Sequence, residues 1–505
     1  MKKFKLSVFF KFFRVLHGEI ICVKTTLFFP LPQELFMFKN LMVKQWPFWL
    51  GGLVVGFSEI LYYTFTWMNP DMEADFINVT SGFAQMYAAV EANILGLDLV
   101  GQVYEPNIHW TIIGALAGAR LVGIIEKDVR SWVRYNWRMI LLAFVGGMLF
   151  SFGTRLAMGC TTHHFMGGLP AMSIASWMVL FSGIPFAFIA FKISLKLELG
   201  GYFRHQETKP VARLVHDSKD HTNPGYDPDY VPLKDPLRFV FNTILILFLA
   251  IPLYFAIFTD AFAGSISNLG IWGTLGFLIP GLFLGFGIAK SGFGTECSVM
   301  APESVIINKE KYCNAGMPEC TFRMFRSMAP LQGFMVAIVL FNIFLMIVWL
   351  SGAGEMPLAS GDEYGLYWGH IVGGPFLAMG AVFMIGCEVR TYARLGLGYM
   401  TALAALPGFF IGYIPYTMNK EAIDEVMFGE GLTELLTVPQ LFDSLLGGGE
   451  VLWALVYSAF LIGLLIFSFA VGRKFFKIGF KDMMGKNTDE LVYAEVNPEP
   501  FLNKK

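Results

Sequence analysis

VGGMLFSFGTRLAMGC, residues 145–160, and VGGPFLAMGAVFMIGC, residues 372–387, are two versions of one segment. Aligned without a gap, they share Val-Gly-Gly, a glycine after five residues, and Gly-Cys after five more. The correspondence extends outward, because GLVVGF at 52–57 returns as GLFLGF at 281–286, and LPAMS at 169–173 returns as LGYMT at 397–401. These offsets of 227, 229 and 228 residues indicate that two halves of the chain repeat one another.

The composition predicts a membrane protein. Of 505 residues, 55% are apolar and only 15% are charged, which is too apolar for a surface that faces only water. Apolar runs of about 20 residues are long enough to cross a hydrocarbon core of roughly 30 Å as helices. The predicted spans are 45–66, 107–126, 138–159, 173–195, 237–259, 268–290, 328–350, 367–387, 396–416 and 450–472.

The distribution of Lys and Arg orients these spans, because both residues accumulate in cytoplasmic loops. Residues 1–44 are rich in Lys and Arg, whereas 68–105, 352–363 and 421–450 contain none. The alternation places both termini in the cytoplasm. In the predicted order, each helix and its counterpart are five spans apart. Because five is an odd number, the second copy crosses the membrane in the opposite direction. Transporters built from inverted repeats hold their sites at the repeat interface near the bilayer midplane.

The predicted fold is therefore all-α: a polytopic membrane protein of about ten helical spans in two inverted-topology repeats with re-entrant Gly-Cys segments. Residues 1–44 form a cytoplasmic or interfacial extension. The first repeat covers 45–259, including a cytoplasmic loop at 197–235. The second repeat covers 268–472, and a cytoplasmic tail covers 473–505.

The Gly-Cys segments are the candidate functional sites. After Gly159-Cys160 and after Gly386-Cys387 the sequence turns polar and then becomes apolar again without a long loop. Such segments re-enter the membrane only where their backbone faces protein or a wet cavity. A new helix that starts there directs N–H groups and a positive dipole end at an anion. A neutral thiol is a soft, weak donor that suits a polarisable sulfur atom.

These residues resemble the YeeE/YedE sulfur-transport family, bacterial inner-membrane proteins associated with thiosulfate uptake. The resemblance rests on both Gly-Cys runs, on YARLG at 392–396 and on GFGIAKSGFGTECSVMAPE at 285–303. It implies that thiosulfate passes between thiols through S–H···S contacts, and the matching thiols are Cys160, Cys297 and Cys387. Cys160 is expected toward the outside and the other two toward the cytoplasm. Met68 stands where the family often has a further cysteine.

Charged and imidazole side chains lie close to these thiols in the sequence. Arg155, within a predicted span, either attracts a divalent anion or reaches the interface. His163 and His164 either line the entrance or are structural, and adjacent side chains point apart, which argues against a shared metal. Glu296 and Glu388 adjoin two of the cysteines. A carboxylate that faced the path would repel an anion.

The expected function is transport of a sulfur-containing anion, thiosulfate foremost, into the cytoplasm across the bacterial inner membrane. No catalytic residue, cofactor, metal site or nucleic-acid surface is predicted, and without a nucleotide motif the transport is passive or coupled to an ion gradient. The partners are the anion, the bilayer and, as a candidate, a small cytoplasmic sulfur-carrier protein. Two alternatives stay open: a membrane sulfurtransferase that forms a persulfide on Cys297 or Cys387, and transport of another sulfur or selenium oxyanion.

Overall fold

The computed structural model describes residues 46, 48–69, 72–79, 82–91, 96, 107–125, 137–196, 235–259, 264–291, 328–353, 365–384 and 386–476. The expected N-terminal extension and most of the expected loop 197–235 and tail 473–505 lie outside these residues. The described part is built from helices, with two isolated β-bridges and no strand. The prediction of an all-α fold is therefore confirmed.

Each of the ten predicted spans corresponds to a helix. The helices are α3 (Phe48–Met68), α4 (Gly82–Val90), α5 (Trp110–Ile125), α6 (Trp137–Leu156), the π-helix η2 (His163–Gly168), α7 (Ile174–Lys196), α10 (Asp235–Phe258), α11 (Ile266–Ser291), α15 (Met328–Leu350), α16 (Trp368–Met384), α17 (Glu388–Gly396), α18 (Met400–Met418), α19 (Lys420–Phe428), α20 (Val438–Leu446) and α21 (Glu450–Phe476). Within the described residues, eight helices are long and apolar enough to cross a membrane. α5 is apolar but has only 16 residues.

The equivalent helices α6 and α16 pack against each other in opposite directions. Their glycines lie so close to the facing backbone that an added Cβ would come within 2.5 to 2.7 Å of a backbone nitrogen. The close pairs are Gly146 with Met384, Phe150 with Gly380, Gly153 with Leu377, and Ala157 with Gly373. Rising numbers on one helix meet falling numbers on the other. Each pair also has its two-fold counterpart at the repeat offset of 227.

The other central pair, α3 and α11, is antiparallel as well. Phe57 stacks edge-on against Phe283 at 5.8 Å between ring centroids, and Phe65 against Phe277 at 5.1 Å. Because α3 and α11 are also repeat equivalents, both pairs of counterparts run in opposite directions. The packing therefore has the inverted arrangement that an odd number of spans predicts.

Gly52 with Gly56, and Gly281 with Gly285, have the GxxxG spacing that lets helix backbones approach closely, and these glycines are contact positions between helices. An added Cβ at any of four glycines would overlap or crowd the backbone of the neighbouring helix, so only glycine permits these approaches. The contacts are Gly52 with Gly333, Gly56 with Ala337, Gly281 with Thr111, and Gly285 with Ala115. The first two join α3 to α15, and the last two are their equivalents between α11 and α5.

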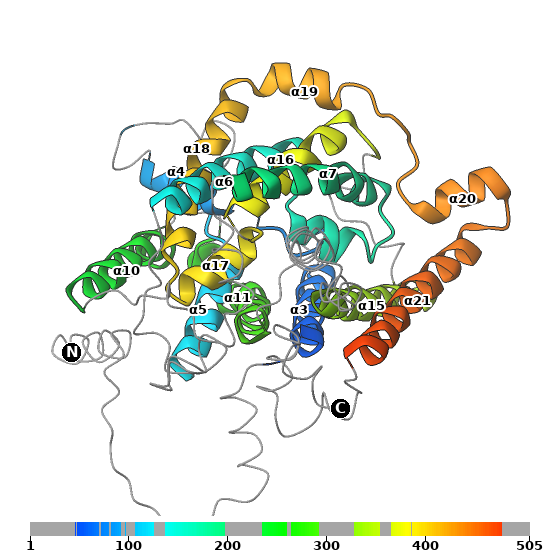
Figure 1. Ribbon diagram of the computed structural model, residues 1–505, viewed down its shortest axis with the longest axis horizontal. Coiled ribbons are helices and arrows are strands. Elements are labelled where there is room, and N and C mark those ends of the chain that lie inside the picture. Colours follow the sequence, from blue (N-terminus) through cyan, green and yellow to red (C-terminus); the bar gives the residue numbers. More distant parts are fainter. Residues whose placement is uncertain are drawn as a thin grey trace, which may run out of the picture.

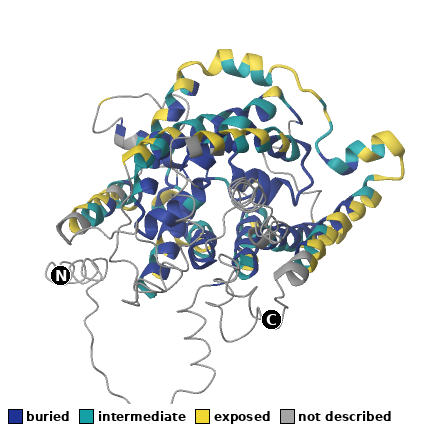
Figure 2. Cartoon of the chain, in the orientation of Figure 1, coloured by how far each residue is buried: buried dark blue, intermediate teal, exposed yellow. Residues whose placement is uncertain are grey.

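Two polar side chains hold the short helices η2 and α17 in equivalent places. Arg120 on α5 donates to the Gly396 carbonyl at the end of α17, at 3.4 Å. Asn342 on α15 donates to the Pro170 carbonyl just beyond η2, at 2.7 Å. Each side chain satisfies a carbonyl that its helix leaves unpaired. In Figure 1, α17 lies in the interior beside α5 and α11, and Figure 2 shows buried residues concentrated there.

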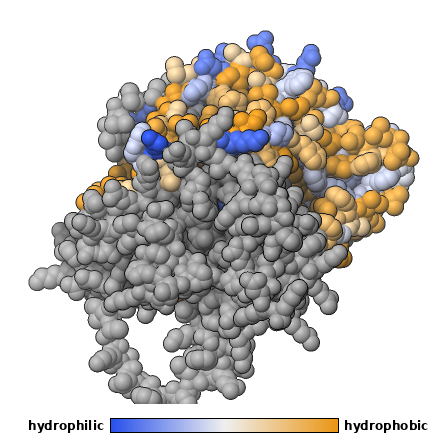
Figure 3. Space-filling view, viewed as in Figure 1, coloured by the Kyte–Doolittle hydropathy of each residue, from blue (hydrophilic) through white to orange (hydrophobic). Residues whose placement is uncertain are grey.

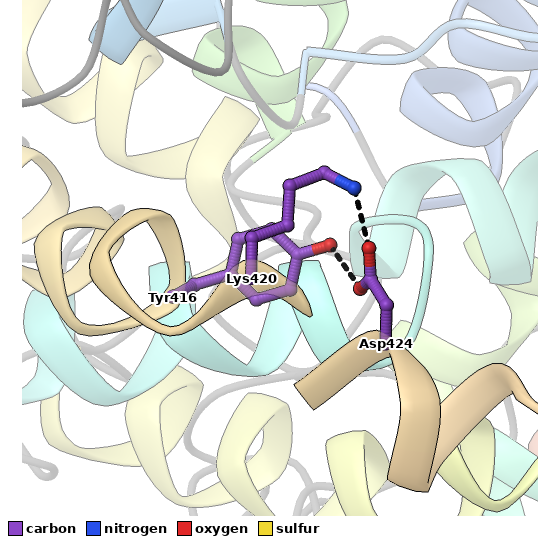
Figure 4. A network of polar contacts seen from close by, with 3 residues as sticks. All are labelled: Tyr416, Lys420 and Asp424. Carbon is purple, nitrogen blue, oxygen red and sulfur yellow. Dashed lines mark hydrogen bonds and ion pairs between the residues drawn. The ribbon is translucent and has the colours of Figure 1, made fainter. Parts of the chain in front are cut away.

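The helices α19, α20 and α21 form an arc outside this core (Figure 1). At the junction of α18 and α19, the Tyr416 hydroxyl donates to Asp424 at 2.8 Å and Lys420 pairs with the same carboxylate (Figure 4). Farther along, the backbone of Val438 donates to the Met172 carbonyl at 2.9 Å, which ties the start of α20 to the first repeat. Apolar side chains dominate the outer face that α20 and α21 present, as expected for a surface in lipid (Figure 3).

Candidate functional site

Both Gly-Cys segments break a helix and start a short new one. α6 ends at Leu156 and α16 at Met384, and helical structure resumes directly after Cys160 and Cys387. The two glycines are required for different reasons. A Cβ at Gly159 would lie 2.6 Å from the His163 ring, whereas Gly386 adopts a φ of 152°, which favours glycine. These turns have the form predicted for re-entrant segments.

The structure brings the two cysteines to one crossing of the broken helices. Cys160 is fully buried, and Cys387 is 2% exposed. The Thr162 hydroxyl, in the first turn after Cys160, lies 3.9 Å from the Cys387 sulfur and donates to it. Cys160 in turn lies within electrostatic range of Tyr392, in the second turn after Cys387. Each broken helix therefore reaches the cysteine segment of the other copy.

Cys387 also caps the helix that it precedes. Its sulfur accepts the backbone N–H of Arg390 at 3.4 Å, the position that a serine or threonine hydroxyl fills in ordinary N-caps. α17 has nine residues, so its N-terminus carries the unpaired N–H groups and positive dipole end of a regular helix. The thiol thus stands at a place that favours negative charge.

Arg155 and Glu388 form the charged part of the cluster. The guanidinium of Arg155 lies 5.1 Å from the Tyr413 ring centroid and within electrostatic range of Glu388. Glu388 is buried, and its Oε1 accepts the Tyr392 hydroxyl at 2.8 Å. Arg155 therefore faces protein groups in the last turn of α6. The carboxyl group of Glu388 faces the cluster as well, although an anion path would exclude a charged carboxylate.

The two predicted histidines are both buried, and they differ in their use of hydrogen bonds. His164 contacts the Ser176 hydroxyl at 3.0 Å and the Ala157 carbonyl at 2.8 Å, so both ring nitrogens hold the turn together. His163 packs on Phe76 at 5.9 Å between ring centroids, and its Nδ1 has no hydrogen-bond partner in the described part of the chain. Of the two, His163 is the side chain with a group left for a ligand.

Other residues of this region were not predicted from the sequence. His370 of α16 lies 6.1 Å from His164 between ring centroids, and its Nδ1 accepts the Tyr367 N–H at 3.1 Å. His370 stands two residues before the repeated Val-Gly-Gly run, and that position was its only sequence signal. Thr162 and Tyr392 lie inside the quoted motifs, yet only the crossing of the helices makes them partners. Among the described residues, no group of three or more His, Cys, Asp or Glu side chains is arranged to hold a metal ion.

Buried polar atoms without partners gather in the first turns after the two cysteines. Within the described ranges they include Thr161 Oγ1, His163 Nδ1, Glu388 Oε2 and Thr391 Oγ1. Thr161 and Glu388 are equivalent by the offset of 227, and each follows its cysteine directly. Most buried polar groups in proteins are hydrogen-bonded. A cluster of unmatched donors and acceptors beside two thiols is the arrangement expected where a small polar solute binds.

The third predicted thiol, Cys297, and its neighbour Glu296 lie outside the described residues. Met68, the counterpart of Cys297, is at the end of α3 and 72% exposed.

Comparison with known proteins finds one family that matches the first part of the chain. A family model described as sulphur transport matches residues 15–185, which span α3 to most of α7 and include Cys160. Neither a curated protein nor a solved structure matches the chain. The match confirms the resemblance for the first Gly-Cys motif: residues 15–185 match the YeeE/YedE sulphur-transport family, and the helices of the described part are those of a multi-pass membrane protein.

Proposed function

We propose that the protein carries thiosulfate, or a closely related sulfur anion, across the bacterial inner membrane into the cytoplasm, on a path past Cys160, Cys387 and Cys297. The observation that carries this proposal is the contact of Thr162 with the Cys387 sulfur, because it joins the cysteine turns of the two repeats. A solute at this crossing meets both thiols.

The surroundings suit an anion. Two short helices begin at the crossing, and helix N-termini attract negative charge through their unpaired N–H groups. Arg155 supplies a nearby positive charge, and Thr161, Thr391 and His163 supply polar atoms that have no hydrogen-bond partner among the described residues. Gly159 and Gly386 allow the tight turns, so a solute approaches backbone as well as side chains.

The thiols select for sulfur. Neutral S–H groups are weak, polarisable donors that match the terminal sulfur of thiosulfate better than the oxygen of sulfate or phosphate. In the described conformation both thiols are buried, so the solute reaches them only after the crossing opens on one side. Opening alternately toward the two faces is the motion expected of inverted repeats.

The orientation and organisation belong to the same proposal. The Lys and Arg distribution places residues 1–44 and 473–505 in the cytoplasm, with repeats at 45–259 and 268–472. α19 carries Glu421 and Glu425 on its exposed surface, without a compensating run of basic residues. This acidic helix then lies outside the cell.

Flux into proteoliposomes tests the function. We expect purified protein to transport labelled thiosulfate faster than sulfate or selenite. Cys160→Ala and Cys387→Ala should each lower the thiosulfate flux about tenfold, the effect of losing roughly 1.4 kcal/mol of interaction. Cys313→Ala, in a predicted cytoplasmic loop, is the control and should transport normally. Wild-type flux from both test variants would exclude a role for the thiols.

A sulfurtransferase is the second candidate, and the position of Cys387 at a helix N-terminus favours it, because such positions stabilise thiolates. In that reaction the thiolate attacks the outer sulfur of thiosulfate, the S–S bond of thiosulfate breaks, and sulfite leaves with the electron pair. A persulfide remains on Cys387 for a small sulfur-carrier protein. Mass spectrometry after incubation with thiosulfate separates the candidates: a stable gain of one sulfur atom on Cys387 supports the enzyme, and an unchanged mass supports transport.

A further inference from the structure

Glu388 is a buried carboxyl group with one oxygen held and the other unmatched. Oε1 accepts the Tyr392 hydroxyl at 2.8 Å, whereas Oε2 has no hydrogen-bond partner in the described part of the chain. The residue is the first of α17 and adjoins Cys387 at the crossing. The hydrogen bond from Tyr392 fixes the orientation of the carboxyl group. Oε2 is therefore the oxygen that is left to gain or lose a proton.

Among the described residues, Arg155 from α6 lies within electrostatic range of this carboxyl group, and the Tyr392 hydroxyl donates to it. Tyr413 and Cys160 lie within electrostatic range of Tyr392. Three other basic side chains, on α17, α5 and α11, have partners of their own. Arg394 donates to Met384 and Thr401, Arg120 to Gly396 and Asn242, and Lys290 lies over the Trp46 ring.

The two protonation states of Glu388 suit different occupants of the crossing. An ionised carboxylate with an unmatched oxygen is costly to bury, but Arg155 supports it when no anion is present. An arriving anion repels that carboxylate and competes for Arg155. A proton on Oε2 removes the repulsion and turns this oxygen into a donor, which an anion accepts.

We propose that Glu388 binds a proton together with the anion, so that the protein is a proton–anion symporter. This inference rests on the proposed function and adds the coupling ion to it. The proton enters on Oε2 from the side that admits the anion, crosses with it, and leaves as the anion departs on the other side. A potential negative inside opposes the entry of a dianion. Each proton carried with it cancels one of its charges.

The test separates coupling to the proton gradient from movement of the anion itself. Proteoliposomes that contain the full chain receive an inside-alkaline gradient of one pH unit, with the membrane potential clamped at zero by valinomycin and equal potassium. For one proton per anion, we expect wild-type protein to accumulate labelled thiosulfate about tenfold, since one pH unit is a factor of ten in proton activity. A second assay measures exchange of external for internal thiosulfate without any gradient.

Glu388→Gln keeps an acceptor for Tyr392 but cannot release a proton. We expect this variant to lose gradient-driven accumulation and to retain exchange, while Glu388→Asp retains both. The matched control is Glu59→Gln. Glu59 is also fully buried, with one oxygen accepting the Ile77 N–H at 3.1 Å and the other unmatched within the described residues, but it lies in the middle of α3 and does not adjoin a cysteine in the chain. The control should accumulate thiosulfate like the wild type.

Three outcomes would overturn the inference: accumulation by Glu388→Gln as in the wild type, loss of exchange along with accumulation, or no response of the wild type to the gradient while it exchanges thiosulfate. Absence of thiosulfate exchange in the wild type is a different result, which refutes the proposed function itself.

Discussion

Cys387 has two roles that a pair of substitutions separates. Its sulfur caps α17 through Arg390, and on our proposal its S–H group contacts the transported anion. Cys387→Ala removes both, while Cys387→Ser keeps an N-cap acceptor and removes the sulfur. Loss of an N-cap costs about 1 kcal/mol, so we expect the alanine variant to lose that much stability and the serine variant almost none. Loss of a hydrogen bond to a charged group costs about 1.5 kcal/mol, roughly tenfold in flux.

The decisive comparison is therefore between stability and flux in the two variants. Stability is read from unfolding by sodium dodecyl sulfate in mixed micelles, and flux from thiosulfate uptake into proteoliposomes. Both variants should lose flux: the alanine variant about tenfold because it has no donor, and the serine variant because its hydroxyl is not the soft donor that matches the terminal sulfur of thiosulfate. Only the alanine variant is destabilised. Flux near the wild-type value in Cys387→Ser would refute the reasoning, because the capping role alone would then explain the residue.

Three further expectations follow from the packing and burial. Gly380→Ala should destabilise the protein by about 1–3 kcal/mol, because its Cβ would lie 2.5 Å from the Phe150 nitrogen, whereas Gly463→Ala, with nothing within 4 Å, should change stability by less than about 0.5 kcal/mol in the same unfolding titration. His164→Ala should cost about 2 kcal/mol, since two hydrogen bonds are lost, and unchanged unfolding would contradict their role. In the wild-type protein, a membrane-permeable maleimide should label the peptide that contains Cys160 slowly at rest and faster during thiosulfate transport, as read by mass spectrometry; equal rates would argue against a closed crossing.

The helices and their inverted pairing were predictable because apolar length, loop charge and repeat offset are properties of the linear sequence. Which side chains contact one another at the site could not be predicted from the sequence. Thr162 and Cys387 are 225 residues apart, and only the crossing of two broken helices brings them together. His370 lies in an apolar span, and its place before the repeated Val-Gly-Gly run was its only sequence signal. The proposed role of Glu388 was hidden for a related reason: a carboxyl group beside a thiol indicates repulsion of an anion until its partner Tyr392 is known.

The two repeats share a scaffold but differ in chemistry where they cross. Glycine, cysteine and the helix start occur in both copies, so the thiols and the positive helix ends are supplied twice. The next position is Thr161 in one copy and Glu388 in the other, and both carry a buried polar atom without a partner within the described chain. Two carboxylates at these equivalent places would repel each other and the anion. One carboxyl group and one hydroxyl instead provide a single place for a proton and a neutral contact opposite it. On our proposal, a two-fold scaffold with a carboxyl group from only one copy at its centre opens to either side, and the proton and the anion share the same small set of side chains.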